Sequence, residues 1–121
     1  MPLKVRKSKA PALLCPLGEC MSLLRGAWTP AVIWHLSGGP RRFGELRGDI
    51  QGVSAKMLSA RLRELVNKGV VAREVKPTSP PSVEYSLTEL GQELSPAIAA
   101  IVSVGYRLKA RAEGVARVAA E

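Results

Sequence analysis

The chain has 121 residues, of which 46% are hydrophobic, and a net charge of +8 at pH 7. This length fits a single domain, and no apolar run approaches the roughly 20 residues that a membrane-spanning helix needs. Two cysteines and one histidine are too few for a disulfide scaffold or for a structural zinc site. We therefore expect no metal, no other cofactor and no membrane association.

The distribution of charge is more informative than its sum. Residues 1–11 are basic without apolar periodicity, which predicts a flexible arm, and no apolar stretch of a secretory signal follows them. We therefore expect a cytoplasmic protein. Between Arg41 and Lys76, nine basic residues occur with four acidic ones. This clustering fits a surface that binds polyanions, but a solvated, soluble surface explains the charge equally well.

Two short helices are predicted before residue 40. The first begins at Pro16, because a proline costs no hydrogen bond at the first helical position, and it ends at Gly26. Its apolar face comprises Leu17, Cys20, Met21 and Leu24. The second opens at Thr29-Pro30, with Thr29 as the cap, and residues 38–40 (Gly-Gly-Pro) end it.

The centre of the chain predicts two helices joined by a tight turn. A short strand at Arg41-Arg42 precedes a helix from Phe43 to about Asp49, and residues 51–53 form the turn. The next helix follows Ser54, whose hydroxyl can cap it. Because each residue rotates a helix by about 100°, one stripe is buried and the opposite stripe is exposed. The buried stripe is Leu58, Leu62, Leu65 and Val66, and the exposed one is Lys56, Ser59, Ala60, Arg63 and Asn67.

A β-hairpin and a long helix complete the domain. Residues 70–76 and 82–87 read as strands on either side of a tip with three prolines, which cannot donate to a sheet. The last helix, about residues 88–113, is capped by Thr88, and Pro96 should kink or split it. We expect residues 114–121 to fray. The apolar stripe of this helix is Leu90, Leu94, Ile98, Ile101 and Leu108.

This order predicts a mainly α fold with a small β-hairpin wing (α+β), a winged helix-turn-helix domain over residues 12–113. The helix-turn-helix would cover about residues 43–67 and the wing about residues 70–87. The helix after Ser54 would enter the major groove of double-stranded DNA, and the wing would follow the adjacent backbone or minor groove. The expected DNA contacts are Arg41, Arg42, Arg47, Ser54, Lys56, Ser59, Arg63, Arg73, Lys76, Thr78 and Ser79. Each basic residue can read a base or hold a phosphate, and a solvated helix face or an exposed turn is the alternative.

The chain resembles the HxlR-type winged-helix transcriptional regulators, a MarR-like family. The resemblance covers about residues 15–105 and rests on Cys15-Pro16, Trp28-Thr29 and residues 42–46, 53–58, 61–65 and 83–91. It implies a homodimer that binds near promoters, with N- and C-terminal helices packed across the two-fold axis. The interface residues would be Leu17, Met21, Leu94, Ile98, Ile101 and Leu108. Two positions depart from the family: Arg25-Gly26-Ala27 replaces the usual Gly-Gly-Lys, and Val104 replaces a common tryptophan.

A sensing function depends on the two cysteines. Cys15 stands at a predicted helix N-terminus behind the basic arm, which favours the thiolate, and some relatives of this type sense oxidants or electrophiles there. A small packing residue is the other interpretation, and the one we favour. Cys20 falls on the apolar stripe and is predicted to be a buried, inert thiol. Because a Cys15–Cys20 disulfide would break the helix, an intersubunit bond or an adduct is the redox product we expect.

The sequence has no acid–base pair, nucleophile triad or phosphate-binding glycine loop, so we do not expect an enzyme. The leading prediction is a dimeric, sequence-specific regulator of transcription that binds an inverted repeat, because two half-sites supply the affinity. A winged-helix module for protein–protein assembly and a non-specific nucleic-acid binder are the alternatives. Outward-facing Lys56 and Arg63 favour DNA over assembly. Trp28 and Trp34 could line an effector pocket, but core packing is the preferred role for Trp28.

Overall fold

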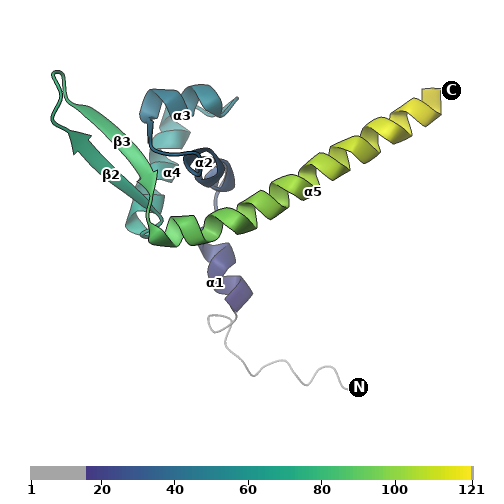
Figure 1. The fold of residues 1–121 in the computed structure, drawn as a ribbon, viewed down its shortest axis with the longest axis horizontal. Helices are drawn as coiled ribbons and strands as arrows, with labels where there is room; N and C mark the ends of the chain where they lie inside the picture. The colour runs from purple at the N-terminus through teal and green to yellow at the C-terminus, as the bar shows by residue number, and fades with distance from the viewer. Residues whose placement is uncertain (1–15, 121) are drawn as a thin grey trace, which may run out of the picture.

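The computed structural model describes residues 16–120, which form five helices and one sheet. Figure 1 shows a head built from the central helices and the hairpin, with the last helix extending well beyond it. The elements are α1 (Pro16–Leu23), α2 (Thr29–Leu36), β1 (Arg41–Arg42), α3 (Phe43–Asp49), α4 (Ala55–Asn67), β2 (Val71–Lys76), β3 (Ser82–Leu87) and α5 (Glu89–Ala120). The predicted mainly helical fold with a small antiparallel sheet is confirmed, including the short strand at residues 41–42.

The sheet has three antiparallel strands in the order β1-β3-β2. In the hairpin, Val71 pairs with Leu87 and Arg73 with Tyr85, while Glu74 pairs with Glu84. Because side chains alternate between the faces of a strand, the first two pairs lie on one face and the glutamates on the other. Val71 is buried, and Tyr85 and Leu87 pack against the core. This register decides which face of the hairpin looks toward α4.

The core lies where α2, α4 and the first turns of α5 meet the sheet. It is aliphatic, as the composition predicted, and each helix contributes one stripe at helical spacing. The helix α4 buries the three predicted leucines, and Val66 is half-buried. The buried apolar residues are Val32, Ile33, Leu36, Leu46, Ile50, Val53, Leu58, Leu62, Leu65, Val70, Val71, Leu94 and Ile98.

The turn between α3 and α4 has the predicted geometry. Gly52 adopts a φ of +88°, in the left-handed region that favours glycine. The Ser54 hydroxyl oxygen accepts a hydrogen bond from the Met57 N–H at 3.1 Å, so Ser54 caps α4 as expected. The indole of Trp28 also lies against this turn, since a Cβ at Gly52 would be 3.3 Å from its Cη2 atom. Trp28 packs against the core, as predicted, and ties the α1–α2 loop to the helix-turn-helix.

Thr29 does not cap α2, which corrects the sequence-based prediction. The capping position belongs to Trp28, which has a φ of +73° and whose carbonyl accepts from the Val32 N–H at 3.0 Å. Thr29 is the first helical residue and is buried, and its hydroxyl donates to the carbonyl of Arg25 at 2.9 Å. The Thr29 hydroxyl therefore hydrogen-bonds to the preceding loop and does not accept from the free N–H groups of the first helical turn.

The last helix is longer than predicted. Pro96 lies inside α5 without splitting it, and the segment predicted to fray after Glu113 is helical to Ala120. Pro96 removes only one intrahelical hydrogen bond. The buried side chains of Leu94 and Ile98, on either side of the proline, fasten this part of α5 to the core. None of the helices in residues 16–120 combines the length and the apolar composition that crossing a membrane requires.

The first helix packs on the head only through its C-terminal end. There the Lys68 ammonium donates to the carbonyl of Ser22 at 3.0 Å, and Leu23 and Leu24 pack against the core. The rest of α1 is exposed, including Cys20. The prediction of a buried Cys20 is therefore wrong for the single chain, because no other element within residues 16–120 covers the apolar face of α1. Cys15 and the predicted basic arm, residues 1–11, lie outside the described residues.

Candidate nucleic-acid interface

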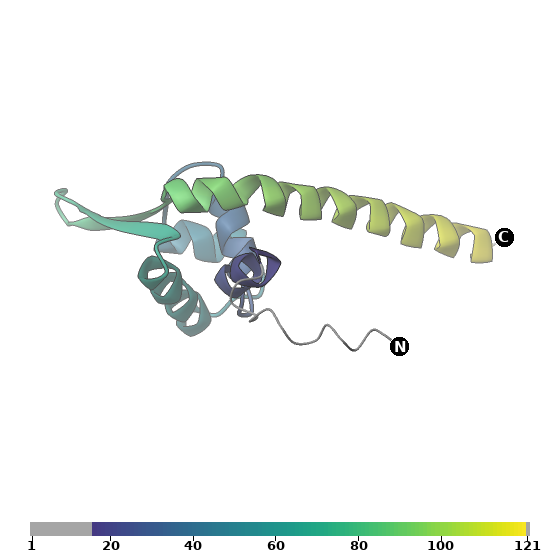
Figure 2. The same cartoon turned by 90° about the horizontal axis from the view of Figure 1, so that it is seen from below.

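The exposed face of α4 carries the polar stripe that the sequence predicted. Lys56, Ser59, Arg63 and Asn67 are exposed, and Ala60 is half-buried. They lie opposite the leucines that pack into the core, so the helix is fixed by one face and presents the other. Figure 2 shows α4 beside the base of the hairpin, on the side away from α5.

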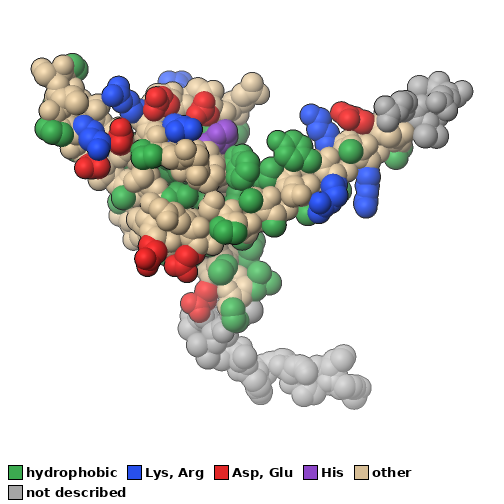
Figure 3. All heavy atoms as spheres, in the orientation of Figure 1, with side chains coloured by type: hydrophobic (Ala, Val, Ile, Leu, Met, Phe, Trp, Pro, Cys, Tyr) green, Lys and Arg blue, Asp and Glu red, His purple; other side chains and the backbone are tan. Residues whose placement is uncertain are grey.

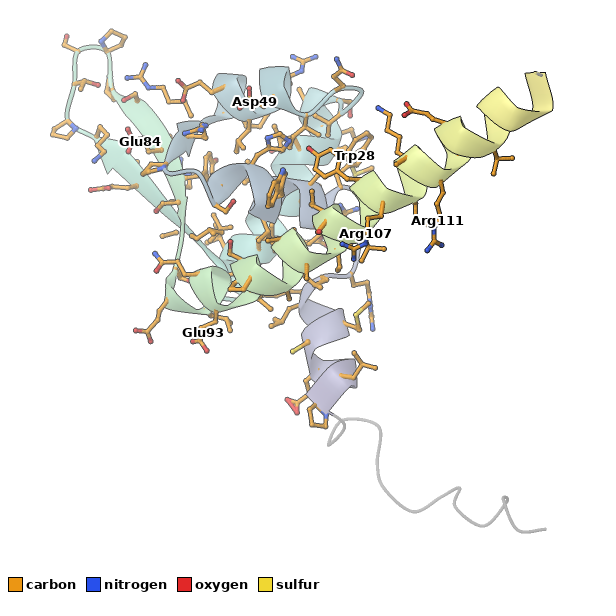
Figure 4. The ribbon with its side chains drawn as sticks, turned by 45° about the vertical axis from the view of Figure 1, so that its right-hand side comes forward. Trp28, Asp49, Glu84, Glu93, Arg107 and Arg111 are labelled. Carbon is orange, nitrogen blue, oxygen red and sulfur yellow. The ribbon has the colours of Figure 1, made fainter. Side chains whose placement is uncertain are left out.

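The hairpin has one basic and one mixed face. Arg73 stands opposite Tyr85 on the face that turns toward α4. On the other face, Glu74 stands opposite Glu84, and Lys76 lies beside both (Figure 4 labels Glu84 on the hairpin). Directly opposed like charges destabilise a strand pair, so the lysine has a structural reason to be there.

Lys76 forms ion pairs with both glutamates. Its Nζ atom is 3.2 Å from Oε1 of Glu74 and 3.7 Å from Oε1 of Glu84. The hydrogen bond and charge of Glu74, followed by the charge of Glu84, raise the pKa of Lys76. This ion-pair cluster lies on the face away from α4, which argues against the predicted role of Lys76 as a DNA contact.

A groove of about 310 Å³ runs between α4 and the hairpin. Its apolar floor is formed by Leu62 and Val66. Its polar walls are formed by Ser59, Arg63 and Asn67 of α4 and by Arg73 and Tyr85 of the hairpin. Among the described residues, no acidic side chain lines this groove. It therefore brings together three of the predicted DNA contacts, Ser59, Arg63 and Arg73, of which the two arginines are ten positions apart in the sequence.

The arginines near α3 differ in how much they are held by the protein. Arg41 is partly engaged, because its Nε atom is 3.7 Å from Oδ2 of Asp49 and its Nη1 atom donates to the carbonyl of Pro40 at 3.1 Å. Arg42 and Arg47 are exposed. The Arg42 backbone N–H donates to Glu45 at 2.8 Å, which anchors the start of α3 and leaves the guanidinium outside.

At the hairpin tip, Thr78 is used to shape the turn. Its hydroxyl donates to the carbonyl of Pro80 at 2.7 Å and lies 3.3 Å from the hydroxyl of Ser82. Ser79 is exposed at the tip. Of the two hydroxyls predicted to contact DNA from the wing, Ser79 therefore has fewer interactions within the protein.

Two residues of this region were not among the predicted contacts. Tyr85 and Asn67 both line the groove, and Asn67 was predicted only to lie on the exposed stripe. The period-two alternation of the strand sequences contains the missing signal. It places Arg73 and Tyr85 on one face and separates them from Glu74, Lys76 and Glu84 once the register is known.

Arg61 is in the middle of α4, but its side chain is mostly buried and interacts with other parts of the protein. It forms an ion pair with Glu64, and its side chain is only 18% exposed. A Cβ at Gly26 would be 3.0 Å from its Nη1 atom, so the guanidinium lies under the α1–α2 loop. In the part of the chain that the structure describes, no group of His, Cys, Asp and Glu residues could hold a metal ion.

Comparison with known proteins agrees with this arrangement. The chain is 39% identical over 97 residues to the HTH-type transcriptional regulator YdeP of Bacillus subtilis, which covers 80% of this chain and 76% of YdeP. The structure superposes on the redox regulator HypR in its oxidized form with a TM-score of 0.73 and 36% identity, over 77% of this chain and 96% of HypR. The reduced form of the transcriptional regulator YodB from B. subtilis gives a TM-score of 0.66 and 39% identity, over 74% and 88% of the two chains.

The wing, the capped α4 and the helix-turn-helix all fall within residues 23–113, which match the family described as HxlR-like helix-turn-helix. A match over most of the chain, together with relatives of this identity, shows that the chain belongs to the HxlR-like helix-turn-helix family.

Proposed function

We propose that this chain is a homodimeric regulator of transcription that binds double-stranded DNA in a sequence-specific way. In this proposal α4 lies in the major groove, and the β2–β3 wing lies on the adjacent backbone or minor groove. The observation that carries it is the exposed polar stripe of α4, which continues into a groove with two arginines and no acid among its lining residues. The protein acts as a binding protein in the cytoplasm and not as an enzyme.

The DNA contacts in this proposal are the predicted residues that the fold leaves available. They comprise the exposed arginines before the turn, the polar residues of α4 and the face of the wing that turns toward α4. An N-terminal position on α4 favours contact with base edges, whereas backbone phosphates position the domain. The contacts are Arg42, Arg47, Ser54, Lys56, Ser59, Arg63, Arg73 and Ser79, with Arg41 and Thr78 partly engaged within the protein.

Exposed apolar side chains on α1 and α5 support the dimer. Leu17 is 69% exposed and Ile101 is 61% exposed, and both belong to apolar stripes. Figure 3 shows hydrophobic side chains gathered along α1 and the part of α5 next to the head. A long helix that extends beyond its own domain exposes this apolar stripe to water, which is unfavourable in free energy. Burial of the stripe against a second copy of the chain would remove this free-energy cost. The exposed members are Leu17, Met21, Ile101, Val104, Leu108 and Val115.

Some of the predicted interface residues are exposed in the single chain and others are buried in its core. Leu94 and Ile98 lie on the same stripe of α5 as Ile101 and Leu108, but they are buried in the core of the single chain, which removes them from the proposed interface. A two-fold dimer would present two copies of α4 and would bind half-sites about one DNA turn, or a multiple, apart. The operator is therefore an inverted repeat.

The deciding experiment is selection from random duplexes at physiological salt, with the bound DNA read by sequencing. We expect an inverted repeat to be enriched by the wild-type protein. Lys56→Ala should weaken or change the enriched sequence, whereas Lys109→Ala, with the same loss of charge on α5, should leave the sequence unchanged. Binding without any enriched sequence would instead support a non-specific nucleic-acid binder, and no binding would support an assembly module.

Redox sensing is a second proposed function, favoured by the similarity to the redox regulator HypR. We propose that the Cys15 thiol is the sensing group. Oxidation of the wild-type protein should change its affinity for the selected DNA, and Cys15→Ser should abolish this response. Cys20→Ser is the matched control on exposed α1 and should keep the response. If mass spectrometry finds Cys15 unmodified after mild oxidant treatment, redox sensing by Cys15 is contradicted, and a packing role for this residue is supported.

A further inference from the structure

The groove between α4 and the hairpin is lined by two arginines and by no acidic side chain of the described residues. We propose that it seats one phosphodiester group of the DNA strand that separates the major from the minor groove, held jointly by Arg63 and Arg73. The inference rests on the proposed function, because it assumes DNA on the α4 face. It makes Arg63 a phosphate contact and leaves the reading of bases to the N-terminal half of α4.

The position of the groove is the first argument. A single sugar–phosphate strand separates the major groove of DNA from the adjacent minor groove. If α4 enters the major groove and the wing the minor groove, this strand must pass between the two elements. The groove lined by Ser59, Arg63 and Asn67 on one side and by Arg73 and Tyr85 on the other lies at that place. Its floor of Leu62 and Val66 sets how deep the strand can sit.

The donors that line the groove are the second argument. Two arginines from different elements line one space, and arginine matches the oxygens of a phosphate with paired N–H donors. The hydroxyl groups of Ser59 and Tyr85 and the amide of Asn67 add neutral donors. Two cations that share a groove repel each other, and a bound anion would relieve this repulsion.

The placement of the acids is the third argument. Glu74 and Glu84 are on the opposite face of the hairpin, where Lys76 lies within 3.2 and 3.7 Å of them. Glu64 is paired with Arg61. The nearby carboxylates are therefore held away from Arg63 and Arg73, and an incoming phosphate meets no acidic side chain among the residues that line the groove.

The groove also divides α4 into two parts with different roles. Lys56 lies outside the groove and seven residues before Arg63, about 10 Å along the helix axis. A phosphate seated at Arg63 and Arg73 would fix the depth and orientation of α4, and this brings the first turns of the helix to the base edges. Lys56 and Ser54 are thus the side chains placed to discriminate between sequences.

The test compares the salt dependence of binding to unselected, random-sequence duplexes. The slope of log affinity against log salt changes by about 0.9 for each phosphate that a protein neutralises. We expect Arg63→Ala and Arg73→Ala each to reduce the slope by less than this amount per subunit, because the remaining arginine still partly neutralises the phosphate. The double variant should reduce it by about 0.9 per subunit, because both side chains hold the same phosphate. Both arginines are exposed, so their replacement should leave the fold intact.

Lys76→Ala is the matched control, since it removes one positive charge from the opposite face of the same hairpin and should keep the wild-type slope. An unchanged slope for the double variant would overturn the proposal. Single variants that each lose about 0.9 per subunit, with a double variant that loses about 1.8, would show two separate phosphates and would also overturn it.

Sequencing of the duplexes that Arg63→Ala selects provides a second readout. The same preferred sequence as for the wild type is expected, and a relaxed preference would make Arg63 a base reader, contrary to the proposal. These outcomes are separable from the proposed function. If the wild-type protein enriches no sequence, the specific regulator is contradicted, while the slopes still test the phosphate seat because they are measured on unselected DNA.

Discussion

Gly91 in the first turn of α5 lies directly against the backbone of Val70, at the start of the hairpin. A methyl group at Gly91 would overlap the carbonyl oxygen of Val70 and come within 3.0 Å of Cδ2 of Leu87. The Thr88 hydroxyl donates to the carbonyl of Gly69 at 2.5 Å, and the Thr88 N–H donates to that of Val70 at 3.0 Å. This contact fixes the direction in which α5 leaves the head.

Replacing Gly91 by alanine should therefore lower the free energy of unfolding by about 3 kcal/mol, near the upper end of the effects of overpacking. Backbone cannot move aside as a flexible side chain can. Urea denaturation of Gly91→Ala and of Gly48→Ala measures this. Gly48 lies in α3 with nothing within 4 Å of its Cβ position, so its substitution should be neutral or slightly stabilising. Equal stabilities of the two variants would contradict the close contact.

Thr29 offers a test between capping and burial. A cap would accept aspartate without loss, because aspartate caps as well as threonine does. The buried hydroxyl that donates to Arg25 predicts the opposite. Thr29→Asp should cost on the order of 3 kcal/mol, since a carboxylate would lose hydration beside a carbonyl oxygen. Thr29→Ser keeps the donor and should cost about 1 kcal/mol for the lost methyl group. Thermal unfolding of both variants separates the two roles.

The contribution of the Ser54 cap to the free energy of unfolding can be measured. Ser54→Ala leaves the Met57 N–H without its partner and should cost about 1 kcal/mol. Ser54→Asp should restore most of this, because a negative charge at a helix N-terminus also interacts well with the helix dipole. Chemical denaturation is the measurement, with exposed Ser59→Ala as the control in the same helix. A loss no larger than that of the control would argue against the cap.

The proposed dimer can be broken on one face of α5. Ile101→Glu should yield a folded monomer in analytical ultracentrifugation, because two carboxylates would be buried in a two-fold interface. Its affinity for the selected inverted repeat should fall by about 100-fold or more, as the second half-site no longer adds. Ala110→Glu places the same charge on the opposite side of the helix and should remain dimeric. A dimeric Ile101→Glu variant would move the interface elsewhere.

The distal part of α5 provides a further check. Arg107 and Arg111 project from α5, with Arg111 further from the head (Figure 4), and the Arg107 Nη1 atom donates to the hydroxyl of Ser103 at 3.2 Å. These arginines lie away from the α4–hairpin groove. Arg111→Ala should therefore leave the salt dependence of DNA binding unchanged. A reduced slope would indicate that α5 itself contacts the DNA backbone.

Local features of the chain were predictable because they depend on neighbouring residues. The Ser54 cap, the Gly52 turn, the strand at residues 41–42 and the stripe of α4 all follow from short-range hydrogen bonding, backbone conformation and helical spacing. The prolines of the wing tip likewise excluded a strand there.

Three predictions failed where packing or loop conformation, and not helical spacing, decided the outcome. The sequence around Thr29 is typical of a helix cap, but the Thr29 hydroxyl donates a hydrogen bond to the carbonyl of Arg25 in the preceding loop. Cys20 lies on an apolar face that no other described part of the chain covers. Pro96 was expected to kink or split α5, and splitting does not occur, since burial of Leu94 and Ile98 on both sides of it keeps one continuous helix.

By itself the sequence determined the order of elements, the two stripes of α4 and the basic character of the region from Arg41 to Lys76, because these are properties of spacing and composition. Only the tertiary structure decided which of those charges act together. The register of β2 and β3 places Arg73 beside Arg63 and turns Lys76 toward Glu74 and Glu84. Strand register and the packing of α4 on the hairpin are long-range relationships, so the local pattern of the sequence could not show them.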